Sequence, residues 1–189
     1  MANETIEILK LLMSNREERF SIRKISKIRK INYKSAYNSL KFLEEEKIVK
    51  LDRLGNTLLC VFNNKFNELV FNAEYLRREQ LFKNKDFLII YNRLSELKFS
   101  FIALLFGSYA KGTAIKNSDM DILTIGGDEK EIKRAISILP DKIHLTFVSY
   151  KDFIHMAKSK EFSVVNEAIK NNIILIGIEE YYRLLKNVE

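Results

Sequence analysis

The segment FGSYAKGTAIKNSDMDIL, from Phe106 to Leu123, carries the least ordinary pattern in the chain. It contains two of the six glycines and two aspartates with one residue between them. The residues before it, Phe99–Phe106, are apolar and aromatic over the length of a buried strand. Residues 121–125 (DILTI) resemble a second strand, closed by two glycines. The pattern predicts a Gly-Ser pair at the end of one strand and paired aspartates at the start of the next.

These residue types suit a phosphate and a metal ion. Asp119 and Asp121 project from one face of an extended chain, and their charges repel unless a cation lies between them. Magnesium prefers oxygen ligands, typically one or two carboxylates with substrate phosphates. Gly107 lets the backbone approach a phosphate, while Ser108 and Lys111 add a hydroxyl and a positive charge at an expected helix start. We therefore expect this segment to hold a triphosphate and a divalent metal ion.

The pattern G-S-x10-D-x-D, with "GT" inside it and Ser118 before the first aspartate, closely resembles the nucleotidyltransferase superfamily of the DNA polymerase β type. The nearest resemblance is to the minimal nucleotidyltransferases, over about residues 85–189. It implies a mixed sheet with packed helices. It also implies a nucleoside triphosphate, with ATP as the first candidate, at the Gly-Ser pair, with Ser118 among the nucleotide-binding residues, and Mg²⁺ or Mn²⁺ on the two aspartates. The implied chemistry is transfer of a nucleoside monophosphate to a hydroxyl of a protein or a small molecule.

One position departs from this pattern. Active members of the superfamily carry a third carboxylate on a later strand, and the corresponding strand here is Lys142–Tyr150. His144 occupies the position where we expect that acid, and Asp141 would have to reach around the strand end. Imidazole is a poor magnesium ligand but a good proton acceptor. His144 is therefore either a base toward the acceptor hydroxyl or a partly buried polar residue without a chemical role.

The first third of the chain predicts three helices and a β-hairpin. Apolar spacing indicates a helix at Glu4–Met13. Ser21 can cap a second helix that runs to about residue 30, with isoleucines 22, 25 and 28 directed inward. Asn32 can cap a third helix that runs to about residue 47. Two strand-like runs flank Gly55-Asn56, a pair that suits a tight turn.

Three helices followed by a hairpin form the order of a winged helix-turn-helix domain, which residues 3–62 resemble. Between positions 16 and 41 there are nine Lys or Arg residues against two Glu, a charge pattern typical of a nucleic-acid footprint. The third helix and the wing supply the expected contacts to phosphates and base edges: Lys34, Ser35, Asn38, Lys41 and Arg53. The resemblance implies DNA binding, and a protein-docking or dimerisation module is the alternative.

We expect an α+β chain in three parts. They are a winged helix-turn-helix domain at 1–62, a helical connector at 63–97 and a nucleotidyltransferase-like domain at 98–189. The connector contains neither Gly nor Pro, its apolar residues recur at helical spacing, and it breaks at the sequence KNKD, residues 83–86. Leu76 is among the residues expected on the apolar face of its first helix.

The composition and the N-terminal sequence of the 189-residue chain indicate the cellular compartment in which we expect the protein. No apolar run approaches the ~18 residues that span a bilayer, and the N-terminus lacks the pattern of a signal peptide. A single cysteine cannot form an internal disulfide, which suits a reducing compartment. We expect a cytoplasmic protein without a membrane segment.

Two functions remain open. The first is a metal-dependent nucleotidyltransferase with a DNA-binding winged helix. Minimal nucleotidyltransferases of this type often act as antitoxins that adenylylate a tyrosine of a HEPN-type toxin, so the resemblance implies a HEPN-type partner. The second is a DNA-binding regulator whose transferase domain is catalytically degenerate at His144 and serves as a nucleotide sensor or an oligomerisation module, such as a homodimer. The intact Gly107, Ser108, Asp119 and Asp121 favour the enzyme.

Overall fold

The computed structural model describes residues 2–137, 142–159 and 161–188. The chain divides into two compact units, Met1–Ala73 and Glu74–Glu189, and the division falls inside helix α4 (Glu68–Leu81). No helix within the described ranges combines the length and the apolar character that a membrane crossing requires.

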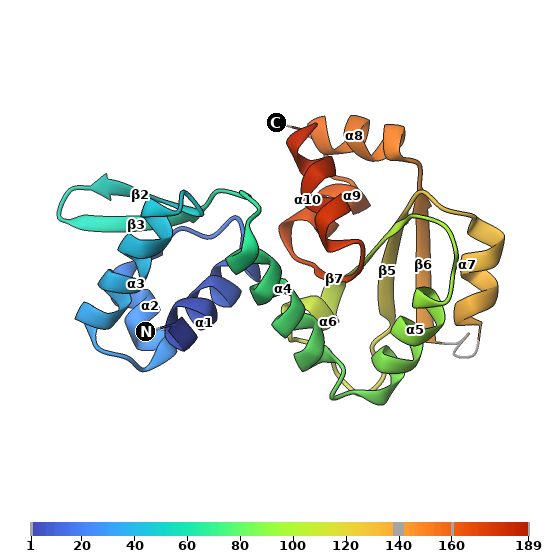
Figure 1. Cartoon of the computed structure of the whole chain (residues 1–189), viewed down its shortest axis with the longest axis horizontal. Coiled ribbons are helices and arrows are strands. Elements are labelled where there is room, and N and C mark those ends of the chain that lie inside the picture. The colour runs from blue at the N-terminus through green and yellow to red at the C-terminus, as the bar shows by residue number, and fades with distance from the viewer. Residues whose placement is uncertain (1, 138–141, 160, 189) are drawn as a thin grey trace. The chain divides into compact units, whose positions relative to one another are not determined.

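The first unit consists of helices around a small antiparallel sheet with the strand order β1-β3-β2 (Figure 1). Its elements are α1 (Ala2–Met13), β1 (Phe20–Ser21), α2 (Ile22–Arg29), α3 (Tyr33–Glu45), β2 (Val49–Leu54) and β3 (Thr57–Phe62). Leu54 pairs with Thr57, so the β2–β3 hairpin turns through two residues, and Gly55 has a φ of 58° there. The expected three helices and hairpin are confirmed, and β1 is an additional short strand.

Both expected helix caps form, but one expected core residue is exposed. The Ser21 hydroxyl accepts a hydrogen bond from the Lys24 N–H, and the Asn32 side chain accepts one from the Ser35 N–H. The expectation that Ile28 points inward is wrong, since that side chain is 45% exposed. At about 100° per residue, the buried residues 22, 25 and 26 of α2 span about 100° of the helix circumference, and Ile28 lies about 60° beyond the edge of that arc.

The second unit is a four-stranded mixed sheet with helices packed on it. The strand order is β6-β5-β4-β7, with β5 and β6 parallel and the other pairs antiparallel. After α4 its elements are α5 (Lys85–Ser95), β4 (Ile102–Phe106), α6 (Gly107–Lys111), β5 (Met120–Ile125), α7 (Glu129–Ile136), β6 (Ile143–Val148), α8 (Tyr150–Lys158), α9 (Val164–Lys170), β7 (Ile173–Ile176) and α10 (Ile178–Lys186). The expected mixed sheet is confirmed.

Helices cover both faces of this sheet. The core beneath α5 and α7 contains Phe87, Ile90, Leu94, Ala103, Leu105, Ile122, Ile132 and Ile136. Successive strand residues point to opposite faces, so Leu104, Phe106 and Leu123 are buried on the other face. Helices α9 and α10 pack against β4, and Figure 1 shows them gathered with α8 beside the sheet. Asp121 has the parity of Leu123 and therefore belongs to this second face.

The part of α4 in the second unit is held by a buried ionic network that the sequence did not reveal. Glu74 is fully buried and Arg77 is 5% exposed, whereas Leu76, expected on the buried face, is 36% exposed. Glu74 Oε2 lies 2.6 Å from Arg77 Nη1, and the Tyr182 hydroxyl donates to Glu74 Oε1 over 2.8 Å. Arg77 also donates to the carbonyl of Asn172. These bonds attach α4 to the C-terminal elements of the unit.

Candidate nucleotide and metal site

The candidate site begins where β4 ends. Phe106 pairs with Asp121 across the antiparallel β4–β5 ladder, and Gly107 follows as the first residue of α6. Gly107 has a φ of 69°, and a Cβ atom there would lie 2.2 Å from Asp121 Oδ2. Only glycine combines this backbone conformation with room for the carboxylate. The glycine therefore lets the Asp121 side chain lie directly against the backbone at the end of β4.

His144 lies on the other side of the same carboxylate. In the parallel β5–β6 ladder it pairs with Asp121, and its Nδ1 is 3.3 Å from Asp121 Oδ1. The imidazole is 72% exposed, whereas the Asp121 side chain is 28% exposed. A carboxylate on one ring nitrogen orients the ring and leaves Nε2 open to solvent and substrate. Asp141 lies outside the described residues.

Asp119 precedes β5 and is exposed. Met120, between the two aspartates, is buried, so alternation along the strand directs Asp119 and Asp121 away from the α5–α7 core. Ser118 has a local role in the turn before them. Its hydroxyl accepts from the Ile115 N–H over 2.9 Å, and its own N–H donates to the Ile115 carbonyl over 3.0 Å. Ser118 therefore shapes the turn from which Asp119 projects.

Helix α6 carries the remaining predicted residues. The Ser108 carbonyl accepts from the Thr113 N–H over 2.9 Å, and Gly112 ends the helix with a φ of 70°. Lys111 is the last residue of the helix, and its Nζ lies 2.9 Å from Glu167 Oε1 on α9. Glu167 was not predicted as a site residue, because its partner is 56 positions away in the sequence.

The donor set at this edge of the sheet fits a hard divalent ion only in part. Asp119 and Asp121 offer carboxylate oxygens, which magnesium prefers, whereas His144, the side chain beside Asp121, offers a nitrogen. Across the described ranges, no three or more His, Cys, Asp or Glu side chains are grouped as a metal site. The chain can therefore contribute two carboxylates to a metal ion, and substrate phosphates would have to supply further ligands.

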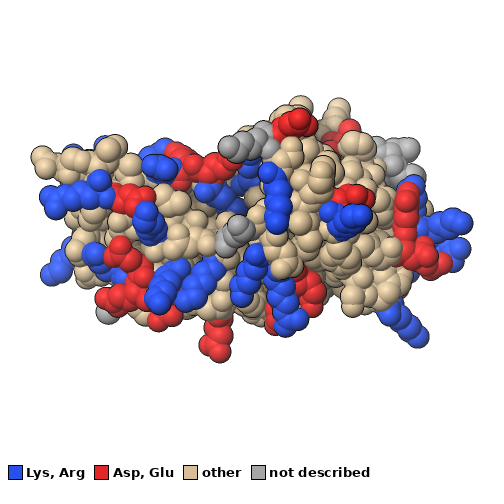
Figure 2. All heavy atoms as spheres, turned by 90° about the horizontal axis from the view of Figure 1, so that it is seen from above, with Lys and Arg blue, Asp and Glu red and all other residues tan. Residues whose placement is uncertain are grey.

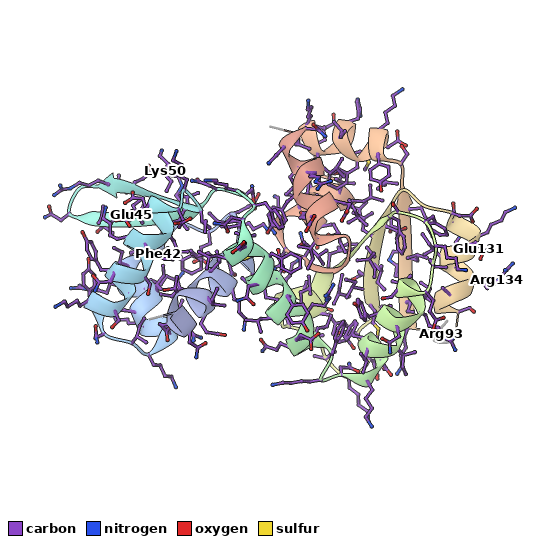
Figure 3. All side chains as sticks on the ribbon, viewed as in Figure 1. Phe42, Glu45, Lys50, Arg93, Glu131 and Arg134 are labelled. Atoms are coloured by element: carbon purple, nitrogen blue, oxygen red, sulfur yellow. The ribbon has the colours of Figure 1, made fainter. Side chains whose placement is uncertain are left out.

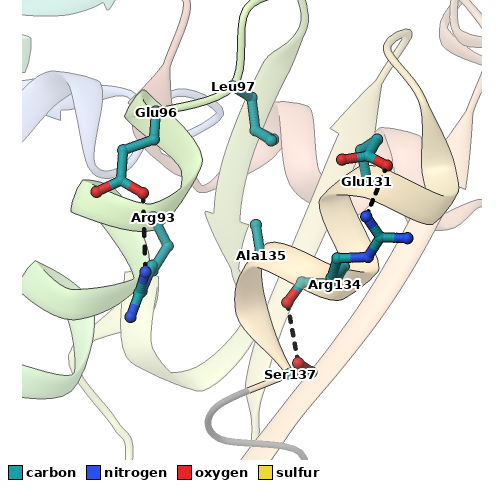
Figure 4. Close-up of a pocket in the computed structure, with 7 residues that line it drawn as sticks. All are labelled: Arg93, Glu96, Leu97, Glu131, Arg134, Ala135 and Ser137. Atoms are coloured by element: carbon teal, nitrogen blue, oxygen red, sulfur yellow. Dashed lines mark hydrogen bonds and ion pairs between the residues drawn. The ribbon is translucent and has the colours of Figure 1, made fainter.

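A hollow elsewhere in the second unit has no part in this site. It has a volume of about 500 Å³, lies between α5 and α7, and contains none of the predicted residues (Figure 4). Arg93 lies 3.8 Å from Glu96, and Arg134 lies 3.2 Å from Glu131, so each arginine pairs within its own helix. Figure 3 shows Arg134 projecting outward from α7. The positive and negative charges that line this hollow balance each other, so the hollow lacks the excess positive charge that would favour binding of a triphosphate.

Gly107, Asp121 and His144 therefore lie together at one edge of the mixed sheet of the second unit. Residues 90–176, which lie in the second unit, match the model of the nucleotidyltransferase domain family. A solved structure described as "Crystal structure of the toxin-antitoxin with AMP-PNP" is 22% identical, with a TM-score of 0.36. The similarity covers 56% of this chain and 84% of that one. No curated protein matches this chain.

The residues predicted to contact DNA lie in the first unit. Lys34, Ser35 and Asn38 are exposed on α3, opposite the buried Ala36 and Leu40. Lys and Arg side chains are interspersed with acidic ones over the face seen in Figure 2, so the positive charge does not form one block there.

The other two predicted basic residues already have partners. Lys41 Nζ lies 2.6 Å from Glu44 Oε2, and this hydrogen bond raises the pKa of Lys41. Arg53 Nε donates to the Gly55 carbonyl at the hairpin turn over 3.2 Å. A phosphate would have to compete with Glu44 for Lys41. None of the ion pairs among the described residues involves Lys34, so a phosphate meets no such competitor there.

A second hollow, of about 390 Å³, lies beside the first turn of α3. Its lining comes from the start of α2, from Tyr33 and from the hairpin turn, and includes Arg23 and Asn56. This hollow was not predicted, because it is formed by segments that are distant along the chain.

Proposed function

We propose that the second unit transfers a nucleoside monophosphate from ATP or another nucleoside triphosphate to a hydroxyl group of a protein or a small molecule. The observation that carries this proposal is the contact between Gly107 and Asp121. A backbone without a Cβ atom lies against a carboxylate at the end of β4, inside a segment that matches the nucleotidyltransferase domain. In this proposal Asp119 and Asp121 hold Mg²⁺ or Mn²⁺, while Ser108 and Lys111 contact the phosphates.

The reaction forms one bond and breaks one. The acceptor oxygen attacks the α-phosphorus, the bond from that phosphorus to the oxygen bridging it to the β-phosphate breaks, and pyrophosphate leaves. His144 accepts the acceptor's proton at Nε2, since its Nδ1 faces Asp121. When bound, the metal supplies charge stabilisation for the attacking and leaving oxygens.

The test is transfer of label from α-phosphate-labelled ATP with Mg²⁺ or Mn²⁺. Candidate acceptors are a HEPN-type protein with an accessible tyrosine and a panel of small-molecule alcohols. We expect transfer by the native chain and its loss in Asp119→Asn/Asp121→Asn. Asp128→Asn is the matched control, because it removes a carboxylate beyond the opposite end of β5 and asparagine remains a good helix cap. Equal transfer by all variants would contradict the assignment of the two aspartates.

A nucleotide sensor is the second candidate function, and His144 favours it. With a nitrogen donor in the place of the third acid, the site can still bind a nucleotide. It then lacks the charge that would stabilise the transition state of nucleotidyl transfer. This candidate predicts ATP binding without transfer to any acceptor, and a gain of transfer in His144→Asp. The enzyme with His144 as base predicts the reverse: transfer by the native chain and a fall in His144→Asp.

For the first unit we propose a winged helix that binds DNA through α3. The support is the exposure of Lys34, Ser35 and Asn38 together on one side of that helix. Each phosphate contact contributes about 0.9 to the slope of log affinity against log salt concentration. We therefore expect Lys34→Ala to reduce the slope by about 0.9, and Lys41→Ala to reduce it less because Glu44 competes for that lysine.

The matched control is Lys85→Ala, which removes an equal charge from α5 in the second unit. A slope unchanged by Lys34→Ala, or reduced equally by Lys85→Ala, would remove α3 from the interface and favour a protein-docking role for the first unit.

A further inference from the structure

The ion pair between Lys111 and Glu167 joins the candidate site to α9. The two side chains are 45% and 33% exposed, so both remain accessible to a competing ligand. α9 packs against β4, whose last residue, Phe106, pairs with Asp121. Glu167 is therefore an acidic group on the face of the sheet where the triphosphate would bind.

The position of Glu167 is fixed by the way α9 is held at both ends. At its start the Ser163 hydroxyl accepts from the Asn166 N–H over 3.1 Å. After its end the fully buried Asn172 donates to the Ala168 carbonyl over 2.6 Å and to the Tyr181 hydroxyl over 2.9 Å. Anchoring α9 at both ends fixes the backbone of Glu167, so that only side chains have to be ordered when its ion pair with Lys111 forms.

Lys111 has access to the phosphate-binding end of α6. It is four residues after Gly107, so the two positions lie on one side of the helix, one turn apart. Helical side chains lean toward the N-terminus of their helix, which directs the Lys111 stem toward Gly107. The ammonium group can therefore serve either Glu167 or a triphosphate at the start of α6.

We propose that Glu167 is a positioning residue that competes with the nucleotide for Lys111 and thereby lowers nucleotide affinity. This inference rests on the proposed function, because it concerns the same nucleotide. The carboxylate and the triphosphate compete for one ammonium group, and they also repel each other. Binding must therefore displace Glu167, and this competition makes Glu167 a determinant of affinity although it contacts no reacting atom.

The test is the dissociation constant of a fluorescent, non-hydrolysable ATP analogue with Mg²⁺. Glu167→Gln keeps the shape of the side chain and removes its charge. Because exposed ion pairs contribute at most about 1 kcal/mol, we expect Glu167→Gln to lower the dissociation constant about fivefold. In a Lys111→Met background, Glu167→Gln should increase the affinity for the analogue much less. In the chain that retains Lys111, raising the salt concentration should reduce the increase in affinity.

Glu161→Gln is the matched control. It changes the net charge equally at an exposed position before α9, and we expect no comparable gain. If the native chain binds the analogue and Glu167→Gln leaves the dissociation constant unchanged, raises it, or matches Glu161→Gln, the inference is overturned and the proposed function stands. Absence of binding in the native chain and in Glu167→Gln alike would overturn both.

Discussion

Two glycines of the site motif have nearly the same backbone conformation but different surroundings. Gly107 and Gly112 have φ values of 69° and 70°, so an alanine at either position incurs the same left-handed penalty, about 1–2 kcal/mol. A Cβ at Gly112 would meet nothing within 4 Å, whereas one at Gly107 would lie 2.2 Å from Asp121 Oδ2. Non-bonded carbon–oxygen contacts are about 3.3 Å, so Gly107→Ala must displace the carboxylate by about 1 Å.

The two substitutions should therefore have similar effects on stability and different effects on function. We expect both variants to lose about 1–2 kcal/mol of unfolding free energy in urea titrations followed by circular dichroism. A 1 Å displacement of a catalytic group can lower the rate about 100-fold, which is the fall in label transfer that we expect from Gly107→Ala. Gly112→Ala should retain transfer within about twofold, as for a surface substitution. Equal losses of transfer in the two variants would refute the reasoning, because strain in the loop would then explain both.

Two further predictions concern buried groups, one in each unit. Arg77→Ala removes the cation that lies 2.6 Å from the buried Glu74 carboxylate. We expect this variant to lose about 3–5 kcal/mol of unfolding free energy in a urea titration, because the carboxylate is left buried without its cation. A loss below about 1 kcal/mol would contradict the burial of the pair and show that water reaches it. Burial raises the pKa of the Cys60 thiol to about 12, so the thiolate is scarce at pH 8 in the folded chain. Ellman's reagent should therefore label Cys60 only after urea unfolds the first unit, and fast labelling in buffer would contradict the buried position.

The features that the sequence predicted well depend on neighbours along the chain. Ser21 and Asn32 cap helices through the N–H groups three residues ahead of them, so the signal is local. The placement of the Gly-Ser pair at the end of one strand and of the aspartates at the start of the next is local in the same way. The antiparallel pairing that brings Gly107 against Asp121 was not predicted, because the connection between the two strands contains a helix and its length does not determine their direction.

The features that were missed arise from contacts between distant segments. Arg77 forms bonds with Asn172, and Glu74 with Tyr182, so the buried side of α4 is partly ionic and could not be read from apolar spacing. Glu167 reaches the site only because α9 packs on the same face of the sheet as Asp121. Periodicity identifies which residues of a helix share a face, but it does not identify what that face contacts.

His144 determines how the charges of the site can be balanced. Lys111 and Glu167 neutralise each other, so Asp119 and Asp121 leave two negative charges, which one divalent ion balances. A third carboxylate would raise this to three and favour a second ion held by the protein. Moreover, one oxygen of Asp121 faces the imidazole and the other faces the backbone at Gly107. We therefore expect metal to enter this site chiefly with the nucleotide, whose phosphates supply the ligands that the chain lacks.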